Sequence, residues 1–147
     1  MATAVAALSM AACDDKRVYD NFVHTPLSGW ERNDTVTFCV PAMEEEGTYG
    51  LFLNMRTSNS FPFTNITMTV NHSVIPSGRR CTDTLKCVLA DRGGHSLGKG
   101  INLYQYRFRI ATASFRRGDS LCVNVNHGMR REILPGIADV GLTVEKE

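Results

Sequence analysis

The chain has 147 residues and a mass of 16.3 kDa, the size of one domain with a single hydrophobic core. Its 16 basic and 15 acidic side chains give a formal net charge of +1, and the basic residues are dispersed along the chain. This balance excludes the broad positive surface on which nucleic-acid affinity depends, and we expect no nucleic-acid partner.

The first twelve residues, MATAVAALSMAA, form an apolar, uncharged run that stops at Cys13. A membrane-spanning helix needs about 20 apolar residues, whereas the hydrophobic region of a secretory signal takes about 7–15 and ends in small side chains. Because Met10-Ala11-Ala12-Cys13 resembles a bacterial lipobox, we predict a signal peptide over 1–12 and a lipid such as palmitate on Cys13. No Lys or Arg precedes the run, so a start codon further upstream and a chance Ala-rich beginning remain alternatives.

Hydrophobic residues alternate with polar ones along most of the chain after residue 34, the period typical of half-buried strands. The alternation predicts seven strands, around Val36–Val40, Leu51–Met55, Ile66–Val70, Leu85–Leu89, Tyr104–Ile110, Leu121–Val125 and Val140–Val144. Gly and Pro turns separate these segments, and no segment has a sustained helical pattern. We therefore expect an all-β fold, an antiparallel β-sandwich of jelly-roll or immunoglobulin-like type with about seven to eight strands. Residues 13–24 are expected to form a tether and residues 25–147 the single domain.

The stretch GGHSLGKG, residues 93–100, matches the G-x-S-x-G pattern of a hydrolase nucleophile and nearly matches a phosphate-binding loop. Both patterns need a helix after the loop, but the following residues INLYQYRFRI alternate as a strand does. Ser96, Asp119 and His127 reproduce the order of a hydrolase triad, yet an all-β chain offers no parallel sheet to carry it. The stretch is interpreted as a loop between strands. We expect no catalytic residue, no nucleotide and no cofactor.

The remaining cysteines are Cys39, Cys81, Cys87 and Cys122, and four cysteines allow three full pairings in an exported protein. Cys81 and Cys87 lie six residues apart, and on one extended strand they would be too far apart for a bond at about 3.3 Å per residue. We expect unpaired or structural thiols. There is no C-x-x-C motif and no paired His, so the sequence predicts no metal site.

Several blocks together resemble the GldH family of gliding-motility lipoproteins, from about Cys13 to the end. The blocks, in order, are Arg17–Asp20, Ser28–Trp30, Asn54–Arg56, Phe61–Phe63, Asp83–Leu85, Leu89–Asp91, Leu97–Gly100, Met129–Arg130, Leu134–Ile137 and Asp139–Leu142. The resemblance implies a lipid-anchored protein of the bacterial cell envelope that takes part in gliding and type IX secretion. Its partners would be the membrane and other gliding or secretion lipoproteins. The family offers no catalytic residues to carry over.

The candidates for partner contacts are Trp30, Arg56, Met129 and Arg130, together with the pairs Arg79-Arg80, Arg116-Arg117 and Arg130-Arg131. Two other classes of function stay open beside an envelope scaffold. One is a carbohydrate-binding sandwich that uses Trp30, the only Trp in the chain, and the other is a serine hydrolase that uses Ser96.

Overall fold

The computed structural model describes residues 16–147, and no helix occurs among them. Ten strands form in this range: β1 (Arg17–His24), β2 (Trp30–Glu31), β3 (Val36–Val40), β4 (Gly47–Ser58), β5 (Asn65–Ile75), β6 (Arg80–Val88), β7 (Leu103–Phe115), β8 (Ser120–His127), β9 (Ile133–Leu134) and β10 (Ile137–Lys146). The seven predicted strands correspond to β3–β8 and β10. The strands β1, β2 and β9 were not predicted.

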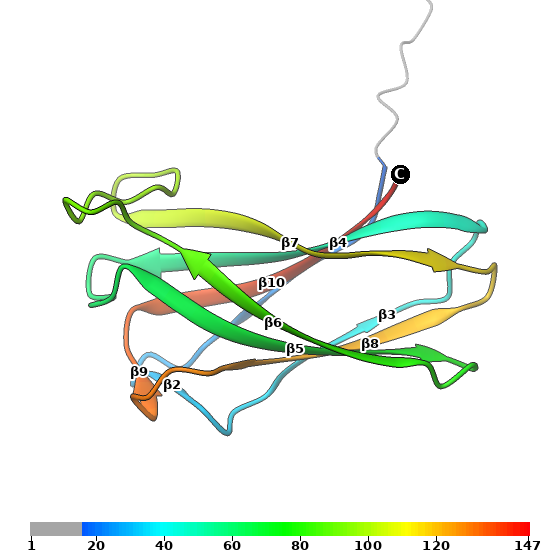
Figure 1. Cartoon of the computed structure of the whole chain (residues 1–147), viewed down its shortest axis with the longest axis horizontal. Helices are drawn as coiled ribbons and strands as arrows, with labels where there is room; N and C mark the ends of the chain where they lie inside the picture. The colour runs from blue at the N-terminus through cyan, green and yellow to red at the C-terminus, as the bar shows by residue number, and fades with distance from the viewer. Residues whose placement is uncertain (1–15) are drawn as a thin grey trace, which may run out of the picture.

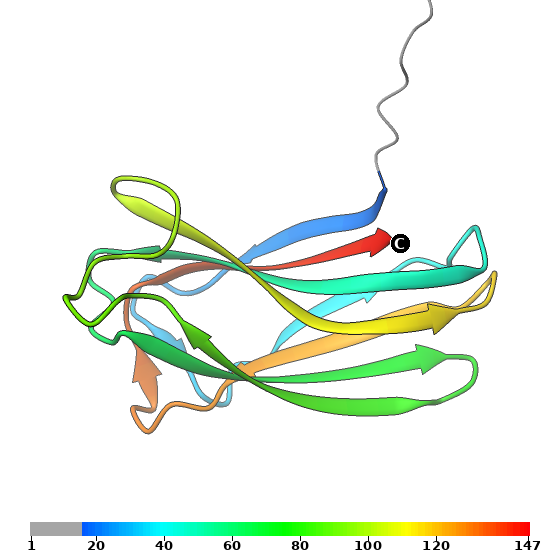
Figure 2. The same ribbon diagram turned by 45° about the horizontal axis from the view of Figure 1, so that its top comes forward.

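Two four-stranded antiparallel sheets face each other, as Figures 1 and 2 show. One has the strand order β1-β10-β4-β7, the other has the order β3-β8-β5-β6, and β2 pairs with β9 in a small two-stranded sheet. The predicted all-β sandwich is therefore confirmed, with ten strands in place of seven or eight. The edge strands are β1 and β7 in the first sheet and β3 and β6 in the second.

The core lies between the two sheets and is made by the alternating residues of the sequence. Phe38, Leu53, Met68, Val123 and Leu142 are each at most 1% exposed. Burying one such side chain contributes about 1.5–3 kcal/mol, so the alternation both specifies the inward face of each strand and drives the sheets together.

The first strand corrects the predicted domain boundary. Residues 17–24 do not form a tether: they pair in antiparallel register with β10, from Arg17 opposite Glu145 to His24 opposite Asp139. The strand lies at an edge and most of its residues are exposed, so its sequence lacks the alternation that marks a half-buried strand. The domain thus includes residues 17–24. The predicted signal peptide over 1–12 and the lipid site Cys13 lie outside the described residues.

The described chain begins and ends at the same end of the sandwich, where the amide of Lys146 donates to the carbonyl of Lys16 over 2.8 Å. We call this the proximal end; it also carries the turns at 41–46, 76–79 and 116–119. The distal end carries the loops at 25–29, 59–64, 89–102 and 128–132 and the small β2–β9 sheet (Figure 1). From residue 16 onward, no helix is long and apolar enough to cross a bilayer.

Candidate functional site

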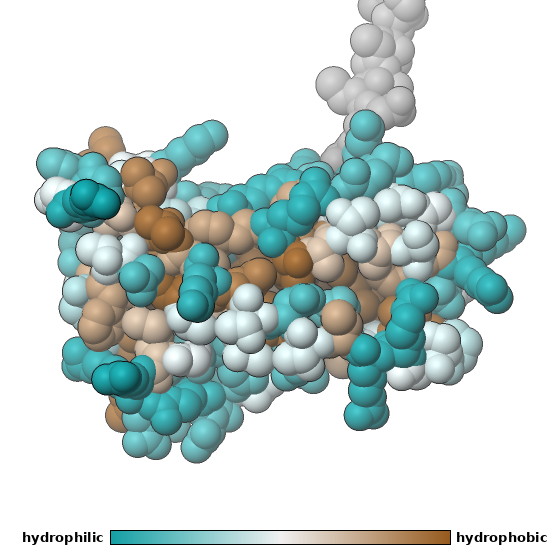
Figure 3. All heavy atoms as spheres, in the orientation of Figure 1, coloured by the Kyte–Doolittle hydropathy of each residue, from teal (hydrophilic) through white to brown (hydrophobic). Residues whose placement is uncertain are grey.

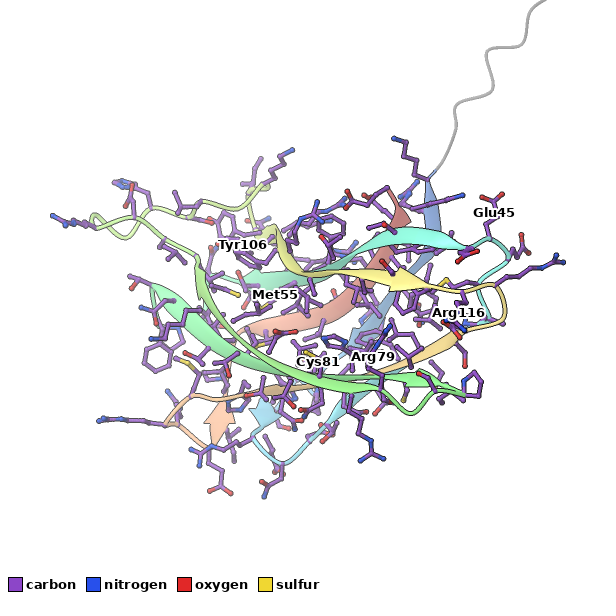
Figure 4. The ribbon with its side chains drawn as sticks, turned by 45° about the vertical axis from the view of Figure 1, so that its right-hand side comes forward. Glu45, Met55, Arg79, Cys81, Tyr106 and Arg116 are labelled. Carbon is purple, nitrogen blue, oxygen red and sulfur yellow. The ribbon has the colours of Figure 1, made fainter. Side chains whose placement is uncertain are left out.

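The proximal end contains an open cleft of about 920 Å³ between the two sheets. Arg79, Arg116 and Arg117 line it, so two of the predicted arginine pairs contribute to one surface. Figure 4 shows Arg79 and Arg116 among the side chains on this side of the molecule. The Arg79 guanidinium donates to the carbonyl of Ser114 over 3.1 Å and so links the β5–β6 turn to β7 of the other sheet. The cleft therefore offers cationic groups held between two sheets.

A second cleft of about 740 Å³ lies beside the start of the described chain. Its lining includes Lys16, Glu45 and Lys146. The ammonium of Lys146 forms a hydrogen-bonded ion pair with the Glu45 carboxylate, and this contact lowers the pKa of Glu45. The pair is exposed, so it contributes little stability by itself. Together with the arginines it makes the proximal end a surface of mixed charge.

At the distal end the fold brings together three of the predicted partner residues. The Trp30 indole donates to the carbonyl of Asp34 over 2.7 Å and lies edge-on to the His127 ring, with 5.2 Å between centroids. His127 Nε2 donates to the carbonyl of Trp30 over 2.9 Å, while the amide of Met129 donates to His127 Nδ1 over 3.3 Å. This arrangement needs a neutral imidazole, and burial lowers the pKa of His127 accordingly.

Trp30 is 0% exposed, so the prediction that it contacts a partner is wrong. Its ring instead fills the core beneath the β2–β9 sheet, where Trp30 is opposite Leu134. Met129 is half-buried, and Arg130 is exposed. The Arg32 guanidinium donates to the carbonyls of Met129 and Arg130 over 3.1 and 2.5 Å. The Arg32 guanidinium therefore holds the inner side of the Met129-Arg130 turn, and only the outer side of the turn is available for contact.

Arg56 lies apart from this cluster, on the outer face of the sheet that contains β4. Its guanidinium stacks 4.0 Å from the centroid of the Phe22 ring and forms a 3.6 Å ion pair with Asp139, which is 5% exposed. The same face carries Arg107 at 3.8 Å from the centroid of the Phe52 ring. These arginines cover aromatic rings and are already engaged within the protein, which gives Arg56 a structural role.

Exposed apolar side chains also gather at the distal end, in and beside the loop between β6 and β7. Leu97, Ile101 and Leu103 are 59%, 85% and 49% exposed, and Val88 at the end of β6 is 57% exposed. Hydrophobic surface is visible at this end of the face shown in Figure 3. A group of exposed apolar residues of this kind typically marks a site of protein contact. The sequence analysis did not single them out, although Leu97 belongs to one of the blocks on which the family resemblance rests.

The residues of the hydrolase pattern do not meet. Ser96 lies in the loop between β6 and β7, as predicted, and its hydroxyl is within 2.7 Å of the Tyr106 hydroxyl. His127 is engaged with Trp30, while the Asp119 carboxylate accepts from the Arg116 amide in the β7–β8 turn at the proximal end. With three separate sets of partners, these side chains form no triad.

The four cysteines within the described range form no disulfide. Cys39 lies directly opposite Cys122 on the solvent face of the β3–β8 pair. Burial first, and the neighbouring Cys39 thiol second, raise the pKa of Cys122. Burial raises the pKa of Cys87 to about 11. Cys81 lies beside His72 and Asp83, and the ligand atoms of these three residues are within 4.8 Å of one another. The sequence analysis predicted no metal site and missed this cluster, which depends on the register between β5 and β6.

The fold and the placement of these side chains define a β-sandwich module with charged clefts at the end where the chain begins and an apolar surface at the opposite end. Its sequence identifies it further. The chain belongs to the GldH lipoprotein family, whose model matches residues 17–144.

Two curated relatives cover nearly the whole chain. The chain is 29% identical to the gliding motility lipoprotein GldH of Flavobacterium johnsoniae, over 97% of this chain and 93% of the relative. It is 26% identical to a GldH homolog of Christiangramia forsetii, over 92% and 88%. Among solved structures, a family 35 carbohydrate-binding module from Clostridium thermocellum is similar at a TM-score of 0.42 and 12% identity, covering 83% of this chain and 87% of the module. That similarity is too low to bear on function.

Proposed function

We propose that this protein is a lipid-anchored, non-enzymatic component of the gliding-motility machinery of the cell envelope, associated with type IX secretion. The observation that carries the proposal is the family match across residues 17–144, supported by relatives that are named gliding motility lipoproteins. The protein acts by holding partners at a membrane, so its function depends on the anchor and on an exposed contact surface.

The position of the chain start suits an anchored module. Cys13 precedes Lys16 by three residues, so an acyl group on Cys13 lies within roughly 11 Å of the proximal end, at about 3.6 Å per residue. The strand β4 has 12 residues and spans roughly 40 Å at about 3.3 Å per residue. The distal end is thus displayed at about one strand length from the point of attachment. Two acyl signals give the stable membrane binding that one chain does not.

The contact surface that we propose consists of Leu97, Ile101 and Leu103, and the Met129-Arg130 turn is a second candidate contact at the same end. The three apolar side chains are exposed at the distal end, where burial against a partner removes them from water. The turn supplies the exposed Arg130 guanidinium on a backbone whose carbonyls accept hydrogen bonds from Arg32. The expected partners are other envelope lipoproteins of gliding and secretion.

The test is a crosslinked affinity capture of the full-length protein from its own membranes, read by mass spectrometry. We expect gliding or type IX secretion lipoproteins to be recovered, and the Ile101→Ser variant to recover at most a tenth as much. Leu27→Ser is the matched control, because Leu27 is a fully exposed apolar residue in another loop. Cys13→Ala should move the protein from the membrane to the soluble fraction. A Cys13→Ala protein that stays membrane-bound and functional would contradict the anchoring part.

One observation favours carbohydrate binding as a second candidate. A hollow of about 250 Å³ at the distal end is lined by Phe61, Phe63 and Tyr104, of which Phe63 is 38% exposed. Aromatic rings of this kind can stack on sugars, whereas the buried Trp30 cannot. Binding to a glycan array that is lost in Phe63→Ala, with no protein partner captured from membranes, would place this candidate first.

A further inference from the structure

The hairpin of β5 and β6 brings together three side chains of different chemistry. His72 and Cys81 are directly opposite each other in the register of the two strands, and Asp83 lies two residues beyond Cys81 on the same side of β6. Because side chains alternate along a strand, all three lie on the face that also carries the core residues Val70 and Cys87. Figure 4 labels Cys81 among the side chains of the β5–β6 hairpin. The Arg79 guanidinium donates to Ser114 and is not a partner of the cluster.

From this geometry we infer that His72, Cys81 and Asp83 form a binding site for a divalent transition metal ion, with Zn²⁺ as the best fit. The three ligand atoms lie within 4.8 Å of one another. His72 Nε2 is 2.8 Å from Asp83 Oδ2, and Cys81 Sγ is 4.0 Å from the same oxygen. Tetrahedral zinc, bound at about 2.0–2.3 Å, separates such ligand atoms by roughly 3.4–3.6 Å. Shifts of about half an ångström bring the two Asp83 distances to these values, and the His72–Cys81 pair, within 4.8 Å, has to close by at most about 1.2 Å.

The ligand types decide which ion fits. A thiolate and an imidazole favour Zn²⁺ and related ions over Ca²⁺ and Mg²⁺, which take oxygen ligands. Three protein ligands leave the fourth tetrahedral position for water or for an external group, as in open zinc sites. Binding releases the thiol proton of Cys81, since the thiolate is the ligand.

The site is both accessible and well supported. The Cys81 side chain is exposed and that of Asp83 is 32% exposed, so an ion can enter from solvent along the edge strand β6. The His72 side chain is only 9% exposed and belongs to β5, an inner strand paired on both sides. One fixed ligand and two accessible ligands on the neighbouring strand allow the ion to bind without rearrangement of the sheet.

The test is Zn²⁺ titration of the full chain, purified in detergent with its thiols reduced and metals removed, by isothermal titration calorimetry. We expect one ion per chain and a rise in the thermal unfolding midpoint with added metal. Loading with Co²⁺ should give a thiolate-to-metal charge-transfer band and the visible bands of a tetrahedral ion. In Cys81→Ser the affinity should fall at least tenfold and the charge-transfer band should disappear, while Asp83→Asn should weaken binding with the band retained.

The matched control removes the other accessible thiols. Cys39→Ser/Cys122→Ser changes the pair on the outer face of the second sheet and should leave both affinity and band unchanged. Because Cys81 is exposed, its replacement by Ser should also keep the unfolding midpoint of the metal-free protein. The inference is overturned if the wild-type protein binds no Zn²⁺ at millimolar concentration. It is equally overturned if binding survives in Cys81→Ser or depends on the outer pair. Both results are independent of whether the protein takes part in gliding.

Discussion

Replacing Trp30 tests whether this residue stabilises the fold or contacts a partner at the distal end. The side chain is 0% exposed and its indole donates to the carbonyl of Asp34. Removing a buried Trp side chain costs about 3–5 kcal/mol, and the lost hydrogen bond lies within that range. A domain of this size is stable by about 5–15 kcal/mol, so Trp30→Ala should lose a large part of the total. Trp30→Phe keeps a ring in the core and should cost about 1–2 kcal/mol.

The assay is urea unfolding followed by far-ultraviolet circular dichroism, which does not depend on the fluorescence of the replaced residue. Both variants should have a lower urea midpoint than the wild type, and Trp30→Ala should have the lowest. The dependence of the unfolding free energy on urea concentration should be unchanged. Trp30→Phe should still capture partners at the wild-type level in the cold, because the outer surface of the Met129-Arg130 turn is unaffected. If Trp30→Ala changed the unfolding free energy by less than about 1 kcal/mol yet abolished capture, the burial argument would be refuted.

Two further predictions follow from the titrating groups. Because the pKa of His127 is lowered from its ordinary value of 6.5, the unfolded chain binds this proton first as the pH falls, and the stabilisation present above pH 6.5 is lost below it. The urea midpoint should therefore fall more between about pH 7 and about pH 5 in the wild type than in His127→Gln. An equal fall in both proteins would contradict a neutral, buried His127 in the folded state. The thiol of Cys87, with a pKa of about 11 and 2% exposure, should be alkylated only as fast as the protein unfolds. The exposed thiol of Cys81 should be alkylated at once. Digested samples taken at intervals and read by mass spectrometry give the labelling rate of each cysteine, and a Cys87 rate equal to that of Cys81 would contradict the prediction.

The sequence was informative wherever one face of a strand is buried. Val36, Phe38 and Val40 alternate because their neighbours face solvent. In β4 and β10 the alternating polar neighbours Asn54 and Thr143 are themselves buried, yet the hydrophobic residues still mark the inward face. The edge strand β1 has no such contrast, and β2 and β9 have two residues each, too few for any period to show. These three elements exist because of their partners rather than because of their own sequence.

The predictions of site residues from the sequence were limited for a related reason. The burial of Trp30 depends on Leu134 and His127, which lie about a hundred residues away in the chain. The metal cluster requires that His72 be opposite Cys81, and a shift of one residue in the register would turn the two side chains to opposite faces. Spacing within a sequence does not determine the register of a hairpin whose turn is longer than two residues, so a search for ligand motifs misses the cluster.

The pairing of β1 with β10 has a mechanical consequence. In the proposed anchored state, force between a membrane anchor before Lys16 and a partner at the distal end would enter at the first residue of β1 and run along that strand. The hydrogen bonds from Tyr19 to His24 then resist sliding together, because they lie across the direction of pull. Peeling from one end would break them one at a time and needs far less force. An edge strand of few buried contacts can in this way serve as a tension-bearing element, provided that the load arrives along its axis.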